Sequence, residues 1–345
     1  MSLITKLAGL ALGAMLCSPA LAQDADWNKV VEAAKKEGTV TVYNSQLGAP
    51  NFLAVVESFQ KKYGIKVESL DLRASELTER LRAEQAAGRF IADIQMHSAN
   101  SIETGVTQGT LVQPLGTIPN VANIREDMRK EITDTHVPGF LQAYGILVNT
   151  SLVKPEDEPK SWKDLADPKW KGKILSDDMR PLGSGGTMFV VFHKALGQAF
   201  NEKLAENKPV FSRDLRNDAK RVARGEYPVY IPQMFAFAND LKGLPIKVIV
   251  PPEGVPYVSI HFAMMKNAPH PNASKLFINH FLDMESQVTY AKAWMLPVAK
   301  GVEDQLDPES KRFASAKLLG TREMNEYGPM MDLAKKIYPQ GSSRP

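Results

Sequence analysis

The chain has 345 residues, of which 42 are Lys or Arg and 39 are Asp or Glu, with the two signs interspersed. This near-neutral mixture excludes the concentrated basic face of a nucleic-acid-binding protein. The one cysteine, Cys17, leaves the rest of the chain without a thiolate nucleophile, thiolate metal ligands or disulfides. A chain of this length can bury a large core without such covalent links, and it usually divides into two domains.

The first 22 residues are typical of an export signal. Lys6 supplies a positive start, Leu7 to Leu16 is an apolar run too short to span a bilayer, and Ala20 to Ala22 forms a small-residue cleavage site. We therefore expect a mature chain that begins at Gln23 and resides in the periplasm. Cys17 offers a second interpretation, a lipoprotein acceptor cysteine, although large apolar residues precede it.

Helical and strand patterns alternate from residue 26 to residue 96. Apolar residues recur at helical spacing and are followed each time by a short β-rich run. The pattern predicts helices and strands in the order helix 26–36, strand 39–43, helix to Tyr63, strand 65–72, helix 75–87 and strand 92–96. This alternation is typical of an α/β domain with a parallel sheet, in which ligands bind beyond the carboxyl ends of the strands.

A second α/β set follows a strand at 143–149. It comprises strands at 173–177, 228–231 and 246–250, a helix that includes Thr187 and a helix at 217–224. A further strand at 257–265 and a helix at 272–284 come after it. We expect the C-terminal part to pack back on the first domain.

The run Ser184-Gly185-Gly186-Thr187 follows the predicted strand 173–177 and should open a helix. Small residues and free backbone N–H groups at a helix start make an anion-binding site, to which the helix dipole contributes. Arg180 lies four residues earlier and could pair with a carboxylate or phosphate in bidentate fashion. The alternatives are an ordinary helix cap and a surface arginine.

Polar residues also follow the first three strands, where ligand contacts are expected. The candidate ligand-binding residues there are Ser45, Gln46, Arg73, Ser75 and Ser98, with His97 beside the last. Turn chemistry for the first pair and helix capping for Ser75 are the alternative interpretations.

Six segments together resemble the two-lobed solute-binding proteins of bacterial ATP-driven importers, the class that includes ferric-iron-binding proteins. The resemblance covers almost the whole chain after residue 22 and rests on the order and spacing of the segments. They are EGTVTVYNS (37–45), RASELTERLRAEQAAGRFIADI (73–94), YGILVNTSLV (144–153), DLADPKWKGKI (164–174), PPEGVPYV (251–258) and NAPHPNASKLFINHFL (267–282).

This resemblance implies a venus-flytrap fold of type 2, α/β in class, with a mixed, mainly parallel sheet in each lobe. Lobe one would be residues 24–138 plus 254–330, lobe two would be 139–253, and 331–345 would form a C-terminal tail. A ligand would lie between the lobes, and the closed form would be read by an ABC permease in the inner membrane. The resemblance also places Ser184 to Thr187 in the cleft.

The resemblance raises iron as an alternative ligand, because ferric relatives hold Fe(III) through neighbouring tyrosines with His or a carboxylate. The candidates are Tyr227, Tyr230 and Tyr257, but the usual adjacent tyrosine pair is absent. Tyr230 and Gln233 could instead line an organic ligand. We therefore expect no metal or cofactor, with Fe(III) as the alternative.

No nucleophile elbow, phosphate-binding loop or zinc motif occurs in the sequence, so we expect no enzyme. The histidines after His97 show no metal-binding spacing, and we interpret them as structural or surface residues: His136, His193, His261, His270 and His280. The leading hypothesis is a monomeric importer component that captures a small anionic solute, with a ferric-binding protein as the alternative. A receptor that serves a membrane sensor would have the same fold.

Overall fold

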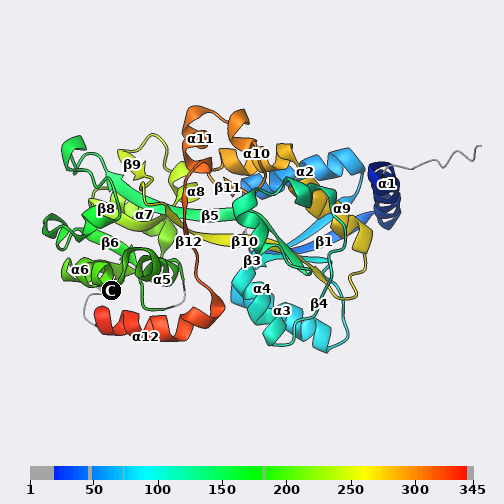
Figure 1. The fold of residues 1–345 in the computed structure, drawn as a ribbon, viewed down its shortest axis with the longest axis horizontal. Helices are drawn as coiled ribbons and strands as arrows, with labels where there is room; N and C mark the ends of the chain where they lie inside the picture. Colours follow the sequence, from blue (N-terminus) through cyan, green and yellow to red (C-terminus); the bar gives the residue numbers. More distant parts are fainter. Residues whose placement is uncertain (1–18, 46–48, 73, 182, 340–345) are drawn as a thin grey trace, which may run out of the picture.

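The protein is described from a computed structural model, which covers residues 19–45, 49–72, 74–181 and 183–339. Two lobes are joined by two long strands, β5 (His136–Asn149) and β10 (Val255–Met265) (Figure 1). The strand order β2-β1-β3-β10-β5-β8-β6-β7 runs from one lobe through this pair into the other. The expected two-lobed α/β fold is confirmed.

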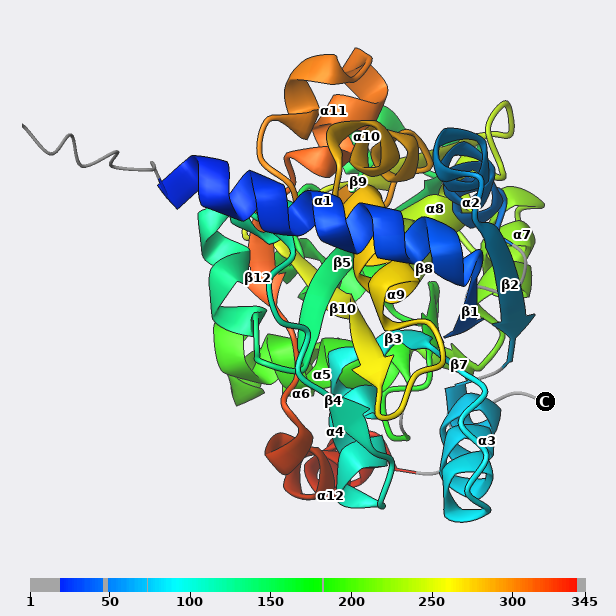
Figure 2. The ribbon, with the colours of Figure 1, turned by 90° about the vertical axis from the view of Figure 1, so that its right-hand side faces the viewer.

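Lobe one contains the first helix and strand set, largely as the sequence predicts. Gly64 ends one of its helices in the left-handed conformation (φ 69°), and its N–H donates to Gln60 O. Figure 2 shows α1 and α9 side by side across this lobe. The elements are α1 (Pro19–Glu37), β1 (Thr39–Asn44), α2 (Pro50–Tyr63), β2 (Lys66–Asp71), α3 (Ala74–Ala86), β3 (Ile94–Ser98), α4 (Ala99–Thr107), β4 (Val112–Gln113), α9 (Pro271–Phe281), α10 (Met284–Lys292), β11 (Leu296–Pro297) and α11 (Pro308–Ala314).

Lobe two contains the second α/β set between the two crossings. Its core includes Trp162 and Trp170 from the loop that precedes β6, and the Trp162 indole donates to Gly254 O at 2.8 Å, beside the start of β10. The elements are β6 (Ile174–Asp177), α5 (Ser184–Leu196), α6 (Gln198–Glu206), β7 (Val210–Ser212), α7 (Leu215–Ala223), β8 (Val229–Met234), α8 (Phe235–Asn239) and β9 (Ile246–Ile249).

The two crossing strands make the sheet more antiparallel than expected. The outer strands do pair in parallel, β1 with β2 and β3, and β6 with β7 and β8. However, β5 and β10 carry the chain between the lobes in opposite directions, so they pair antiparallel with each other, and β10 with β3 and β5 with β8 do the same. Gly139 of β5 is required there, because a Cβ would lie 2.4 Å from the Phe262 ring of β10.

The chain crosses between the lobes a third time, beyond the two crossings that the sequence predicts. Strand β12 (Leu318–Gly320) pairs with the start of β10, and α12 (Tyr327–Ile337) then packs on lobe two. Met331, Ala334 and Tyr338 lie at helical spacing and join the core of lobe two. The structure thus differs from the expectation that 254–330 packs on lobe one and that a tail begins at 331.

Two sequence expectations concern the N-terminus and membranes. Most of the predicted export signal, Cys17 included, lies outside the described residues, and α1 includes the predicted cleavage site at Ala20 to Ala22, so cleavage stays a prediction. Within the described ranges, no helix is long and apolar enough to cross a membrane.

Replacing Met331 with Ala should lower the free energy of unfolding by about 2–3 kcal/mol, because the side chain is 5% exposed and its removal leaves a cavity between α12 and α5. Urea unfolding measures the loss. Asp332→Ala on the exposed side of the same helix is the matched control and should change stability little. Equal effects of the two substitutions would show that α12 does not pack as described.

Candidate functional site

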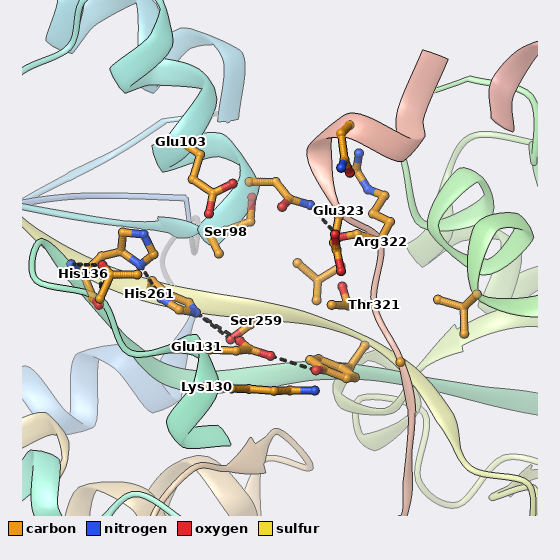
Figure 3. A pocket seen from close by; sticks show the side chains of 18 of the residues that line it. Ser98, Glu103, Lys130, Glu131, His136, Ser259, His261, Thr321, Arg322 and Glu323 are labelled. Atoms are coloured by element: carbon orange, nitrogen blue, oxygen red, sulfur yellow. Dashed lines mark hydrogen bonds and ion pairs between the residues drawn. The ribbon is translucent and has the colours of Figure 1, made fainter. Parts of the chain in front are cut away.

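A pocket of about 620 Å³ lies where the lobes meet (Figure 3). Lobe one contributes α4 and the segment before β5, lobe two contributes α5, and the crossing segments β10 and 319–325 provide the rest. This volume suits a small organic ligand. The polar lining residues are Ser98, Asn100, Glu103, Lys130, Glu131, Thr133, His136, Lys194, Tyr257, Ser259, His261, Thr321, Arg322, Glu323 and Asn325.

One wall of the pocket is a hydrogen-bonded chain of side chains from three segments. The Tyr257 hydroxyl donates to Glu131 Oε1 at 2.8 Å, and His261 Nε2 lies 3.2 Å from Glu131 Oε2 and 2.9 Å from Ser259 Oγ. His136 Nδ1 lies 2.8 Å from His261 Nδ1. An ionised carboxylate only accepts, so His261 donates to Glu131 from Nε2.

Glu131 is an enclosed, ionised carboxylate. Its side chain is only 16% exposed. Burial alone would raise its pKa, but hydrogen bonds from His261, Ser259 and Tyr257 outweigh burial and leave the pKa below its usual value. Burial lowers the pKa of His136 to about 4, so this histidine is neutral near pH 7. Burial and the charge of Glu131 raise the pKa of Tyr257.

Arg322 lies on another wall of the pocket, in the segment after β12 (Figure 3). Its Nε donates to Thr187 Oγ1 at 2.9 Å, and its guanidinium stacks over the Tyr327 ring. Burial lowers its pKa, and no carboxylate lies within 4.0 Å of it among the described residues. Arg322 is therefore a partly desolvated cation without a counter-charge. No motif in the sequence marks this residue.

The start of α5, predicted as the anion site, already carries an internal carboxylate. The Gly185 N–H donates to Asp177 Oδ2 at 2.7 Å, and the Ser184 hydroxyl donates to the Tyr144 hydroxyl at 3.3 Å. Gly185 is also required for packing, because a Cβ there would lie 2.4 Å from Asp178 O. Gly186 is buried similarly, against Pro181 O. Burial raises the pKa of Asp177 to about 6.

Arg180 is occupied within its own loop. Its Nε and Nη2 donate to the two oxygens of Asp178, each at 2.8 Å, and its guanidinium lies over the Phe211 ring. Burial of both side chains keeps this ion pair close, with the arginine 12% and the aspartate 15% exposed. Arg180 does not line the pocket described above.

The other predicted residues are dispersed. Ser98 lines the pocket, and its hydroxyl accepts from Ser101 N at the start of α4. Ser45 is half-buried just after β1, whereas Ser75 is exposed on α3; Gln46 and Arg73 lie outside the described residues. In lobe two, Tyr230 and Gln233 are fully buried, and Gln233 Nε2 donates to Met234 O. Thr187 reaches the pocket only through Arg322.

The three tyrosines of the iron alternative are not brought together in one pocket. Tyr257 lines the pocket described above, Tyr230 is buried in lobe two, and Tyr227 lies against Arg221. In the part of the chain that the structure describes, no group of three or more His, Cys, Asp or Glu side chains is arranged to hold a metal ion. Two histidines interpreted as structural, His136 and His261, instead line the pocket.

Comparisons with known proteins agree on one family. A family model described as bacterial extracellular solute-binding protein matches residues 91–326. The spermidine/putrescine-binding periplasmic protein of Escherichia coli is 26% identical over 328 residues, which cover 90% of this chain and 86% of that protein. A putative 2-aminoethylphosphonate-binding periplasmic protein of Salmonella typhimurium is 25% identical over 284 residues, covering 77% of this chain and 79% of that protein.

The fold also matches that of solved structures. A Trichodesmium protein in complex with iron and citrate superimposes with a TM-score of 0.69 at 22% identity, covering 87% of this chain and 98% of that one. The family and the fold are those of solute-binding proteins and not of enzymes.

Asp177→Asn should stabilise the protein at pH 8 but not at pH 4. The native pKa of about 6 exceeds the unfolded value near 4, so the folded state binds the extra proton and wild-type stability falls as pH rises from about 4 to 6. Asparagine keeps an acceptor for the Gly185 N–H without the charge. Urea unfolding at the two pH values should show a gain of about 2–3 kcal/mol at pH 8.

Asp178→Asn, which weakens the contact with Arg180, is the control and should not stabilise at pH 8. A gain for Asp177→Asn of the same size at both pH values would contradict the assigned protonation.

Proposed function

Because the chain belongs to the family of bacterial extracellular solute-binding proteins, we propose that it is the solute-binding component of an ABC importer and captures a small anionic solute. The solute binds in the pocket between the lobes, with its carboxylate or phosphate group on the Arg322 guanidinium beside the start of α5. The loaded, closed form delivers it to a permease in the inner membrane.

The state of Arg322 carries this proposal. A guanidinium removed from water loses hydration energy, and proteins normally recover it through a carboxylate or another anion. Arg322 has only a hydroxyl and an aromatic ring as partners in the described chain. Its remaining N–H groups suit the bidentate geometry of carboxylates and phosphates, and each charge-assisted hydrogen bond contributes about 1.5–3 kcal/mol.

The proposal keeps the anion near the start of α5 and changes its main partner. The sequence pattern favours the N–H groups of Ser184 to Thr187, with Arg180 nearby, as the anion site. Asp177 occupies the Gly185 N–H and Asp178 occupies Arg180, so neither is open to a ligand in this arrangement. Thr187 still takes part, because its hydroxyl orients the Arg322 guanidinium.

Membership of the solute-binding family also supports a proposal for the protein's partner and its location in the cell. Relatives with matching length are periplasmic binding proteins by name, which supports release into the periplasm after cleavage of the predicted export signal. A monomer suits a protein whose lobes must open and close, and closure is driven by the ligand's higher affinity for the closed form. A ligand receptor for a membrane sensor is the alternative partner assignment, and a permease-binding assay separates the two.

Arg322→Gln should weaken binding of the best anion found in a thermal-shift screen of carboxylates, phosphates and phosphonates by about ten- to a hundredfold, measured by isothermal titration calorimetry. Lys194→Gln is the matched control in the same pocket. Its ammonium is half-exposed and already pairs with Glu326 at 2.7 Å, so the affinity should change only a few-fold. Equal losses of affinity for the two variants would show that Arg322 is not the main binding partner of the anion.

Ferric iron, free or chelated, is the second candidate ligand. The observation in its favour is that the Tyr257 and Glu131 oxygens lie 2.8 Å apart in the pocket, and both are hard ligands that suit Fe(III). A structural relative holds iron with citrate. In this case the protein would bind the metal as its cargo.

The account based on an anionic solute predicts that ferric citrate produces no tyrosinate-to-iron absorption band in the visible spectrum. Titration of the purified protein, with Tyr257→Phe as the control, measures this. A band that appears with the wild type and disappears with Tyr257→Phe would establish iron binding and displace the anionic solute as the leading function.

A further inference from the structure

Two charged side chains in the pocket differ from all the others by being enclosed. Glu103, Lys130, Lys194 and Glu323 are exposed at the rim, where solvent and salt screen them. Glu131 is 16% exposed, and the Arg322 guanidinium is partly desolvated. Figure 3 shows these two on different walls of the pocket. They have opposite sign.

Glu131 has no permanently charged cationic partner, and its one possible ion-pair partner is the His261 imidazole, 3.2 Å from Oε2. The groups that hydrogen-bond to it are the hydroxyls of Tyr257 and Ser259 and the imidazole of His261. His136, the next side chain in this hydrogen-bonded row, is neutral near pH 7. No Lys or Arg nitrogen lies within 4.0 Å of the Glu131 carboxylate among the described residues. Its negative charge is therefore held in place by an imidazole and two hydroxyls, without a permanent cation beside it.

The hydrogen-bonded side chains around Glu131 also fix the orientation of its carboxylate. Glu131 lies at the end of a short 3-10 helix, and its two oxygens are held by β10 through Tyr257 and His261. His136 of β5 in turn lies 2.8 Å from His261 Nδ1 and helps to hold the ring in position. A carboxylate has about four lone-pair sites. Capacity therefore remains for one further donor from the pocket.

We propose that the solute is zwitterionic, with an anionic group on Arg322 and a protonated amine on Glu131. This inference rests on the proposed function and adds the second half of the ligand. An ammonium group offers three donors and a full positive charge, so it recovers the cost of enclosing the Glu131 carboxylate as the anion does for Arg322. A solute with an anion alone would leave Glu131 enclosed without a permanent cation, and the pocket would bind it less well.

The test compares ω-amino acids and ω-aminoalkylphosphonates of two to five methylenes with the same acids lacking the amine. Isothermal titration calorimetry measures the affinity of each compound for the wild type, Glu131→Gln and Arg322→Gln. The wild type should bind at least one amino compound about ten- to a hundredfold more tightly than its amine-free partner. Glu131→Gln should abolish that preference without weakening the binding of the amine-free acid. Arg322→Gln should weaken both compounds of the pair.

Glu103→Gln, at the exposed rim, is the matched control and should keep the preference. If amine-free acids bind as tightly as amino acids to the wild type, or if Glu131→Gln keeps the preference, the zwitterion is overturned and the anion-binding function stands. If no acid of either kind binds, the proposed function fails and the zwitterion falls with it. The wild-type comparison decides the point even if Glu131→Gln does not fold.

Discussion

The antiparallel pairing of β5 with β10 is the constraint on which the rest of this molecule depends. The two strands carry the chain between the lobes and align Ala143 to His136 against Tyr257 to Ala263. Because β12 pairs with the start of β10, the same ladder also places the segment that bears Arg322. Both walls of the pocket are therefore positioned by the strands about which a two-lobed protein opens and closes.

Charge without a partner is the feature that connects this architecture to a function. Most ion pairs in the described chain lie at the surface, where they contribute little. Arg180 is enclosed but paired, and Asp177 is enclosed but responds with a raised pKa. Arg322 is enclosed without a counter-charge among the described residues, and Glu131 is enclosed with only the His261 imidazole and two hydroxyls as partners. A ligand with complementary groups is the remaining way to recover the cost of enclosing them.

Local pattern predicted the elements that depend on near neighbours. Buried strands such as β1 and β6 and the Gly64 cap appear where periodicity and glycine position indicate them. The direction of the crossing strands was not accessible, because strand pairing joins residues more than a hundred positions apart. Long separation in the sequence also hid the third crossing and the packing of α12 on lobe two.

The candidate site was only partly predictable for the same reason. Ser98 was predictable from its place at the carboxyl end of a strand, where it is the last residue of β3, and it does line the pocket. Arg322 was missed because it becomes distinctive only through its contact with Thr187, 135 positions away. His136 and His261, 125 positions apart, have no metal-binding spacing, and folding makes them neighbours. The pairing of Arg180 with Asp178, two residues apart, could have been suspected from the sequence.

A crystal structure of the protein with the acid that binds most tightly in the screen tests the central claim most directly. The account predicts that the anionic group contacts the Arg322 guanidinium in the pocket between the lobes, within hydrogen-bonding distance. A ligand held by Arg180, or by Tyr230 inside lobe two, with Arg322 still bonded only to Thr187, would contradict it.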